Sequence, residues 1–188
     1  MSGKKEKLIS SISHGIQRCR RCERADTRDH AVPGEGNPDS KVLLLGEAPG
    51  QKEDHSGRPF VGRAGNYLDK MFRAHSMERR DVYITSVMKC YHPKSPKRDQ
   101  VDSCFPWTVK QIEVLEPELI LVMGRTAEQG MFNEIHKDQG DKILEWRGIP
   151  CIITCHPAAA MRFPERDRQF RRDFRTMIKM AKERGLFQ

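Results

Sequence analysis

Apolar and polar positions follow two different patterns along this chain. Short continuous apolar runs bounded by turn residues are typical of buried strands, and such runs lie at residues 41–46, 81–88, 119–123 and 149–154. Apolar residues at helical spacing predict helices around them, over residues 5–18, 63–75, 101–115 and 164–184, with another helix from Arg125. Strands that alternate with helices form a mostly parallel sheet covered on both faces. We therefore predict an α/β fold with three layers, α/β/α, around a central four-stranded, mostly parallel sheet.

The chain of 188 residues carries no internal repeat and no low-complexity linker, so we expect a single domain over residues 1–188. The basic N-terminus is not followed by the apolar segment of a signal peptide. No run approaches the roughly 20 apolar residues of a membrane span. We expect an intracellular, cytoplasmic monomer that does not enter a membrane.

The formal net charge of +8 favours an anionic partner, nucleic acid first. A basic but inert surface is the alternative. Arginines are dense near the C-terminus, at Arg162, Arg166, Arg168, Arg171, Arg172 and Arg175. This density suits phosphate contacts, although a solvated helix face would show the same pattern.

Four of the six cysteines form two separated pairs, Cys19 with Cys22 and Cys90 with Cys104. Four thiolates complete either a tetrahedral zinc site or an iron–sulfur cluster. The second pair is spaced too widely for a zinc knuckle, which favours the cluster; four unrelated buried thiols are the alternative. Cys151 and Cys155 are expected to be small buried residues, although Cys155 directly precedes His156 and could lie beside a site.

Glycines and polar residues follow the predicted strands, at Gly46-Glu47-Ala48-Pro49-Gly50, at Ser86–Cys90 and at His156-Pro157. In parallel sheets, ligands bind beyond the carboxyl ends of the strands. Glu47 and Glu53 could orient a water or accept a hydrogen bond from a substrate, or could belong to a solvated loop. Phe60 could stack on a nucleobase or anchor the loop in the core. Pro157 biases His156 towards an extended backbone, which would fix the direction of its side chain.

Together these segments resemble the family 4 uracil-DNA glycosylases, the iron–sulfur members of the uracil-DNA glycosylase superfamily. The matching motifs run in the family's order: Cys19-x-x-Cys22, Gly46–Gly50, Glu53-Asp54, Gly57–Gly62, Ala64-Gly65, Val82–Thr85, Lys89-Cys90, Cys104 and His156–Arg162. The resemblance implies a glycosylase that flips uracil or another deaminated base out of DNA and hydrolyses its N-glycosidic bond. It also implies a 4Fe–4S cluster on Cys19, Cys22, Cys90 and Cys104.

The resemblance assigns roles to individual residues. Phe60 would stack on the base, the backbone at Gly46, Glu47 and Ala48 would contact it, and His156 would stabilise negative charge on its O2. Glu47 and Glu53 would hold the pocket and its water. The loop from Ala158 to Phe163 would enter the DNA, with Met161 or Arg162 as the wedge and Arg166 nearby on the DNA-binding surface.

The chain departs from the family's pattern in the segment Tyr91–Pro96 after Cys90, in a shorter span from Cys90 to Cys104, and at the end of the second strand. Members typically carry Thr-Asn at the second strand end, where the amide reads the edge of uracil, and this chain has Thr85-Ser86. A hydroxyl cannot present the fixed donor and acceptor pair of an amide, so the choice among deaminated bases stays open. Two alternatives also stay open: a non-catalytic or redox-sensing iron–sulfur protein that binds DNA, and a zinc-stapled nucleotide hydrolase.

Overall fold

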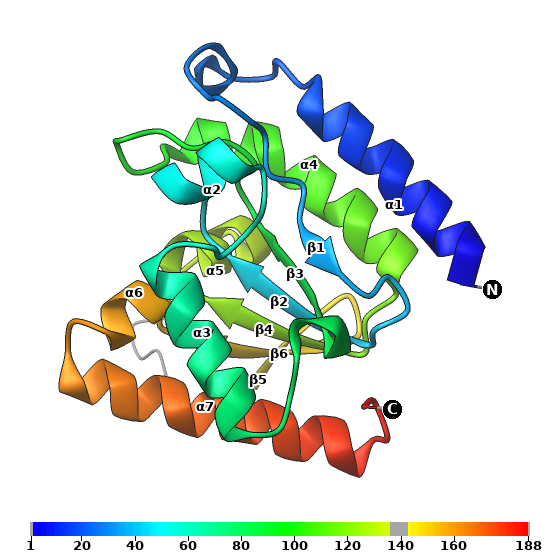
Figure 1. The fold of residues 1–188 in the computed structure, drawn as a ribbon, viewed down its shortest axis with the longest axis vertical. Helices are drawn as coiled ribbons and strands as arrows, with labels where there is room; N and C mark the ends of the chain where they lie inside the picture. Colours follow the sequence, from blue (N-terminus) through cyan, green and yellow to red (C-terminus); the bar gives the residue numbers. More distant parts are fainter. Residues whose placement is uncertain (1, 136–142, 188) are drawn as a thin grey trace.

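A computed structural model describes residues 2–135 and 143–187 of the chain. Its sheet has the strand order β1-β3-β2-β4-β6-β5. The four inner strands are β3 (Tyr83–Ser86), β2 (Val42–Gly46), β4 (Leu119–Met123) and β6 (Ile149–Thr154). All three pairings between these neighbours are parallel. They are the four strands that the apolar runs predict, and they form the centre of the sheet (Figure 1).

Two short edge strands extend the sheet beyond the predicted four. β1 (Glu35–Gly36) pairs antiparallel with β3, and β5 (Ile143–Trp146) pairs antiparallel with β6. The prediction of four strands is therefore corrected to six among the described residues. Neither edge strand is buried on both faces, so neither produces the continuous apolar run that marks the inner strands.

Helices cover both faces of the sheet, as the alternation of elements predicts. α3 (Arg63–Ala74) and α7 (Pro164–Glu183) pack on one face, against side chains that include Val42, Leu44 and Ile152. α4 (Arg98–Leu115) and α5 (Arg125–Phe132) pack on the other, against side chains that include Leu43 and Leu45. α1 (Ser2–Gln17) lies outside α4 (Figure 1). The alternating residues of β2 thus supply two cores, one on each side.

Smaller elements surround the carboxyl ends of the inner strands. α2 (Gln51–Ser56) lies in the connection between β2 and α3, and α6 (Pro157–Ala160) follows β6 directly. Two 3₁₀ turns, η1 (Glu23–Asp26) and η2 (Arg79–Asp81), precede β1 and β3. None of the described helices is long and apolar enough to cross a lipid bilayer. The loops after β2, β3 and β6 meet at one edge of the sheet, where the candidate site lies.

Candidate active site

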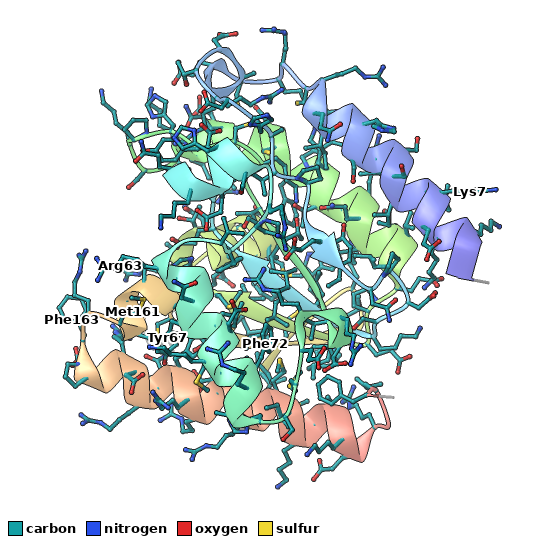
Figure 2. All side chains as sticks on the ribbon, viewed as in Figure 1. Lys7, Arg63, Tyr67, Phe72, Met161 and Phe163 are labelled. Atoms are coloured by element: carbon teal, nitrogen blue, oxygen red, sulfur yellow. The ribbon has the colours of Figure 1, made fainter. Side chains whose placement is uncertain are left out.

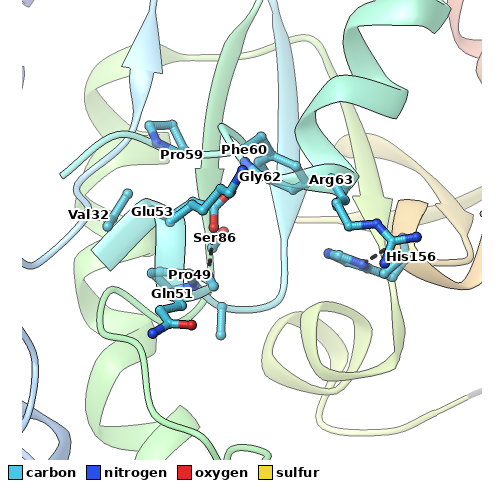
Figure 3. A pocket seen from close by; sticks show the side chains of 15 residues that line it. Val32, Pro49, Gln51, Glu53, Pro59, Phe60, Gly62, Arg63, Ser86 and His156 are labelled. Carbon is cyan, nitrogen blue, oxygen red and sulfur yellow. Dashed lines mark hydrogen bonds between the residues drawn. The ribbon is translucent and has the colours of Figure 1, made fainter. Parts of the chain in front are cut away.

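A cavity of about 380 Å³ opens at the carboxyl edge of the sheet. Six of the residues expected at the site line it: Ala48, Glu53, Phe60, Ser86, His156 and Ala158. They come from three regions that are distant in the sequence, namely the connection after β2, the end of β3 and the segment after β6, and these meet around one hollow (Figure 3). The expectation that the strand ends converge on one site is therefore met by the geometry.

The ring of Phe60 forms one wall of the cavity. It stacks against the imidazole of His156, with ring centroids 5.9 Å apart and an interplanar angle of 26°. The ring also passes over Gly46, where an added Cβ would lie 2.6 Å from the ring edge. Phe60 is 7% exposed and belongs to the core cluster on the α3 side of the sheet. The residue therefore serves as both a core anchor and a cavity wall, and Gly46 provides the space for it.

His156 begins α6 and holds its imidazole in a defined tautomer. The backbone N–H of Ala158 donates to Nδ1 of His156 at 3.2 Å. Because Nδ1 accepts, the proton of a neutral imidazole resides on Nε2. Burial lowers the pKa of His156 below its usual value of 6.5, against the opposing charges of Glu47 and Glu53. His156 is thus a neutral imidazole with an N–H to donate at the cavity.

The two candidate carboxylates are both engaged by backbone amides. Glu53 accepts from Gly62 N at 2.7 Å through Oε1 and from Gly50 N at 3.1 Å through Oε2. Glu47 accepts from Thr126 N at 2.9 Å, at the start of α5. Glu47 is also packed against Gly124, where an added Cβ would lie 2.6 Å from its Oε1. Both side chains therefore tie loops together.

Ser86 lies at the inner end of the cavity and is 6% exposed. Its hydroxyl makes no hydrogen bond to another group in the described part of the chain. Its carbonyl accepts from Lys89 Nζ at 2.6 Å. Lys89 Nζ also donates to Thr85 Oγ1 and Gln111 Oε1, both at 2.7 Å. This buried network fixes the backbone at Ser86 and leaves the hydroxyl available to a ligand.

The loop between α6 and α7 projects apolar and basic side chains beside the cavity. Met161 and Phe163 are 40% and 46% exposed, although both are large and apolar. Figure 2 shows them on the same side of the molecule as Arg63. Arg162 is exposed, whereas Arg166 is half-buried and donates to Gln169 Oε1 at 2.8 Å. Of the four residues expected to contact DNA, Ala158, Met161 and Arg162 are therefore accessible, and Arg166 is held by its neighbour.

The four paired cysteines are free thiols, and Cys90 and Cys104 are buried. Burial lowers the pKa of the Arg24 guanidinium, and the charges of Cys22, Cys90 and Cys104 oppose that effect, so these three thiols lie close to it. Cys19 and Cys22 likewise act on the pKa of Cys90, which burial raises. The two pairs, distant in sequence, are therefore neighbours in the fold.

The surroundings of these thiols fit an iron–sulfur cluster. Arg28 Nη1 donates to Cys90 Sγ at 2.9 Å, and Trp107 Nε1 donates to Cys19 Sγ at 3.3 Å. Hydrogen bonds to sulfur and nearby cations stabilise the negative charge of such clusters. Within residues 2–135 and 143–187, no three His, Cys, Asp or Glu side chains are arranged to hold a single metal ion.

The structure adds residues that the sequence patterns did not single out. Arg63 and Lys52 line the mouth of the cavity, and Arg63 shares a second depression with Met161 and Arg162. Arg63 begins α3 directly after the glycine-rich loop. This position next to the loop is the feature of the sequence that could have identified Arg63 as a site residue. Arg79 binds that loop from η2, and no sequence pattern distinguishes it from the neighbouring surface arginine.

Comparisons with known proteins agree with this geometry. The model of the uracil DNA glycosylase superfamily matches residues 33–179. A type-4 uracil-DNA glycosylase from Archaeoglobus fulgidus is 35% identical over 89% of this chain and 90% of its own length. Another, from Thermotoga maritima, is 36% identical over 95% of each chain. A third, from Sulfurisphaera tokodaii, is 34% identical over 92% of this chain and 84% of its own. The chain therefore belongs to the uracil DNA glycosylase superfamily and, within it, to the type-4 uracil-DNA glycosylases.

Proposed function

We propose that this protein is a DNA repair enzyme that flips uracil, or another deaminated base, out of DNA and hydrolyses its N-glycosidic bond to leave an abasic site. The observation that carries the proposal is that the rings of Phe60 and His156 stack on each other and that both residues line the cavity. An aromatic face and a fixed N–H donor are what a flat leaving base with a developing oxyanion requires. The type-4 relatives support the same activity.

The chemistry separates an anionic base from a cationic sugar. His156 would donate from Nε2–H to the oxygen on which negative charge develops, while Ala158 N–H keeps Nδ1 as the acceptor. One donor aimed at such an oxygen contributes roughly 3–4 kcal/mol of transition-state stabilisation. A neutral imidazole already carries a proton on Nε2, so His156 can donate this hydrogen bond without being protonated to the imidazolium. We assign His156 the catalytic role.

Glu47 and Glu53 would act indirectly. Each has at least one carboxylate oxygen bonded to a backbone amide, so the groups position the loops that hold the base and the water. Their negative charge would also favour the cationic sugar, as would the phosphates of the substrate itself. A strong general base is not required, because departure of the base precedes or accompanies attack by water.

Ser86 would contact the edge of the flipped base. Its hydroxyl can donate or accept, and it is not committed to another group within the described residues. A hydroxyl adjusts to either polarity, so this contact discriminates weakly among uracil, hypoxanthine and xanthine. We propose that shape and the His156 donor select the base more than Ser86 does.

DNA would lie across the side of the molecule that carries the loop from Ala158 to Phe163. Met161 would fill the place left by the flipped base, because apolar side chains commonly occupy such vacated steps. Arg162, Arg63 and Lys52 would contact phosphates around the cavity mouth. The enzyme would act as a monomer inside the cell, where its DNA substrate lies.

Cys19, Cys22, Cys90 and Cys104 would hold a 4Fe–4S cluster. These four residues would thereby connect the start of η1, the segment after β3 and α4 through the cluster, which would stabilise the fold around the cavity. Cys90 lies four residues after Ser86, so the link reaches the backbone that forms the inner end of the cavity. We assign the cluster a structural role.

Strand cleavage after alkali, on duplexes that carry one uracil, hypoxanthine or xanthine, tests the proposal. Cleavage of at least one of the three by the wild type, strongly reduced in His156→Ala, is the expected result. Salt-dependent binding with no base release from any duplex would contradict a catalytic function. That result would favour a non-catalytic DNA-binding protein.

A further inference from the structure

Phe60, the aromatic wall of the cavity, has a backbone conformation that bulky residues rarely adopt. Its φ is +52°, in the left-handed region. Such conformations persist only when the surrounding structure holds them, and they gather at functional sites. The contacts that hold Phe60 therefore decide which way its ring faces.

Two groups hold the backbone carbonyl of Phe60. The backbone of Gly65 lies directly against it, since an added Cβ there would be only 1.6 Å from the carbonyl oxygen. Arg79 Nη2 donates to the same oxygen, and Arg79 Nη1 donates to the carbonyl of Pro59 at 3.1 Å. The left-handed turn is thus fixed by packing on one side and by a guanidinium on the other.

Arg79 is itself anchored in two places. Nη1 donates to Glu35 Oε1 at 2.6 Å, and Nε donates to Asp69 Oδ1 at 2.8 Å. Its side chain is 23% exposed. The planar guanidinium presents its donors in a fixed fork, so this one side chain connects edge strand β1, helix α3 and the cavity loop.

We propose that Arg79 is a positioning residue for base excision, which acts by holding Phe60 in the left-handed conformation that turns its ring towards His156 and the base. The role rests on the proposed function, in which that ring stacks on the flipped base. Without Arg79, the carbonyls of Pro59 and Phe60 lose their donor, and the loop can relax to an ordinary backbone conformation. The ring then leaves its stacking position.

Arg58 offers a matched control. It binds the same carboxylate as Arg79, with Nε 2.8 Å from Glu35 Oε2 and Nη2 3.4 Å from Oε1, but no hydrogen bond from it to the loop carbonyls is among the contacts of the described chain. Arg79→Met should slow single-turnover uracil release by about 100-fold, the scale expected when a reacting group is misplaced by about 1 Å. Arg58→Met should leave the rate within about threefold of the wild type. Equal rates for the two variants would overturn the proposal.

A double-mutant cycle with Phe60→Ala separates positioning from general stability. If Arg79 acts through Phe60, adding Arg79→Met to Phe60→Ala should produce no further loss of rate. A second loss of similar size would overturn the proposal. Arg79→Lys keeps the positive charge beside Glu35 and Asp69, so it should fold even if the Met variant does not. It cannot reproduce the fork, and it should lose about tenfold; wild-type activity in this variant would also contradict the proposal.

A measurement without substrate keeps this test independent of the proposed function. The stacked Phe60 ring should shift the NMR signals of the His156 ring protons, and Phe60→Ala gives the unshifted reference. Arg79→Met and Arg79→Lys should move these signals towards the reference, while Arg58→Met should not. If the wild type releases no base but the signals behave in this way, the proposed function fails and the positioning role stands. Unmoved signals in both Arg79 variants would refute the positioning role even in an active enzyme.

Discussion

Glu53 provides a direct test of whether the acidic residues of the site are loop ties or proton acceptors. Its carboxylate joins the backbone of Gly50 to that of Gly62, at the two ends of the segment that carries α2 and Phe60. Glu53→Gln keeps the size of the side chain but leaves one oxygen acceptor, and its amide group faces a backbone N–H that also donates. One of the two hydrogen bonds is therefore lost, and the acceptor of the other no longer carries a charge.

The expected cost follows from the burial of Glu53, which is 8% exposed. A hydrogen bond to a charged group contributes about 1.5–3 kcal/mol, and a buried donor left without a partner costs about 1–3 kcal/mol. Together these values predict that Glu53→Gln lowers the free energy of unfolding by roughly 2.5–6 kcal/mol. Glu145→Gln, on the exposed face of β5, should change it by less than about 0.5 kcal/mol.

Urea unfolding and single-turnover base release would be measured on the same preparations. If Glu53 is a tie, Glu53→Gln loses stability, and its base release is impaired chiefly through binding of the flipped base. A catalytic base would give the opposite pattern, with unchanged unfolding and a rate reduced by a factor of 100 or more. Unchanged stability of Glu53→Gln would therefore refute the reasoning.

Three further predictions concern other parts of the molecule. Burial lowers the pKa of His156 below 6.5, so the unfolded chain binds that proton more tightly, and stability should fall as the pH drops below about 6.5; urea unfolding between pH 5 and 7.5 should show a smaller fall for His156→Gln. Met161→Ala should reduce excision from duplex DNA about tenfold or more but change excision from single strands little, because only a stacked duplex has a gap to fill; equal losses on both substrates would contradict a wedge. Cys104→Ser should lower the iron content and the thermal midpoint of unfolding together, while Cys151→Ser, at a buried thiol on β6, should keep its iron.

The parts of the fold that the sequence predicts are those where burial dictates the residue type. β4 occupies residues 119–123, as its apolar run predicts, because all five of its residues are buried. The edge strands escaped prediction since pairing at an edge places little demand on side chains. β1 is two residues long, and its Glu35 matters through the arginines it binds.

The candidate site was predictable in position more than in detail. Ligands bind beyond the carboxyl ends of parallel strands. This rule predicts a shared site for Ser86 and His156, and both residues line the cavity. The tie made by Glu53 left a sequence signal, because Glu53 stands three residues after Gly50, which precedes α2, and a glutamate at that position can accept from the backbone N–H of the residue before the helix. The conformation of Phe60 left none, since it depends on Gly65 and Arg79 at once.

The acidic residues around the cavity share one arrangement, which constrains the chemistry. Glu47 and Glu53 accept backbone amides, and the buried Asp54 accepts from Asp29 N and His30 N. Carboxylate oxygens that accept from backbone amides are engaged in holding the loops together. In the proposed mechanism, catalysis therefore comes from stabilising the departing base, through the Nε2–H of His156 and the ring of Phe60. The positions of both groups depend on the loops that carry them. The hydrogen bonds between these carboxylates and backbone amides would therefore affect the rate by keeping the Phe60 ring and the His156 imidazole in their relative positions.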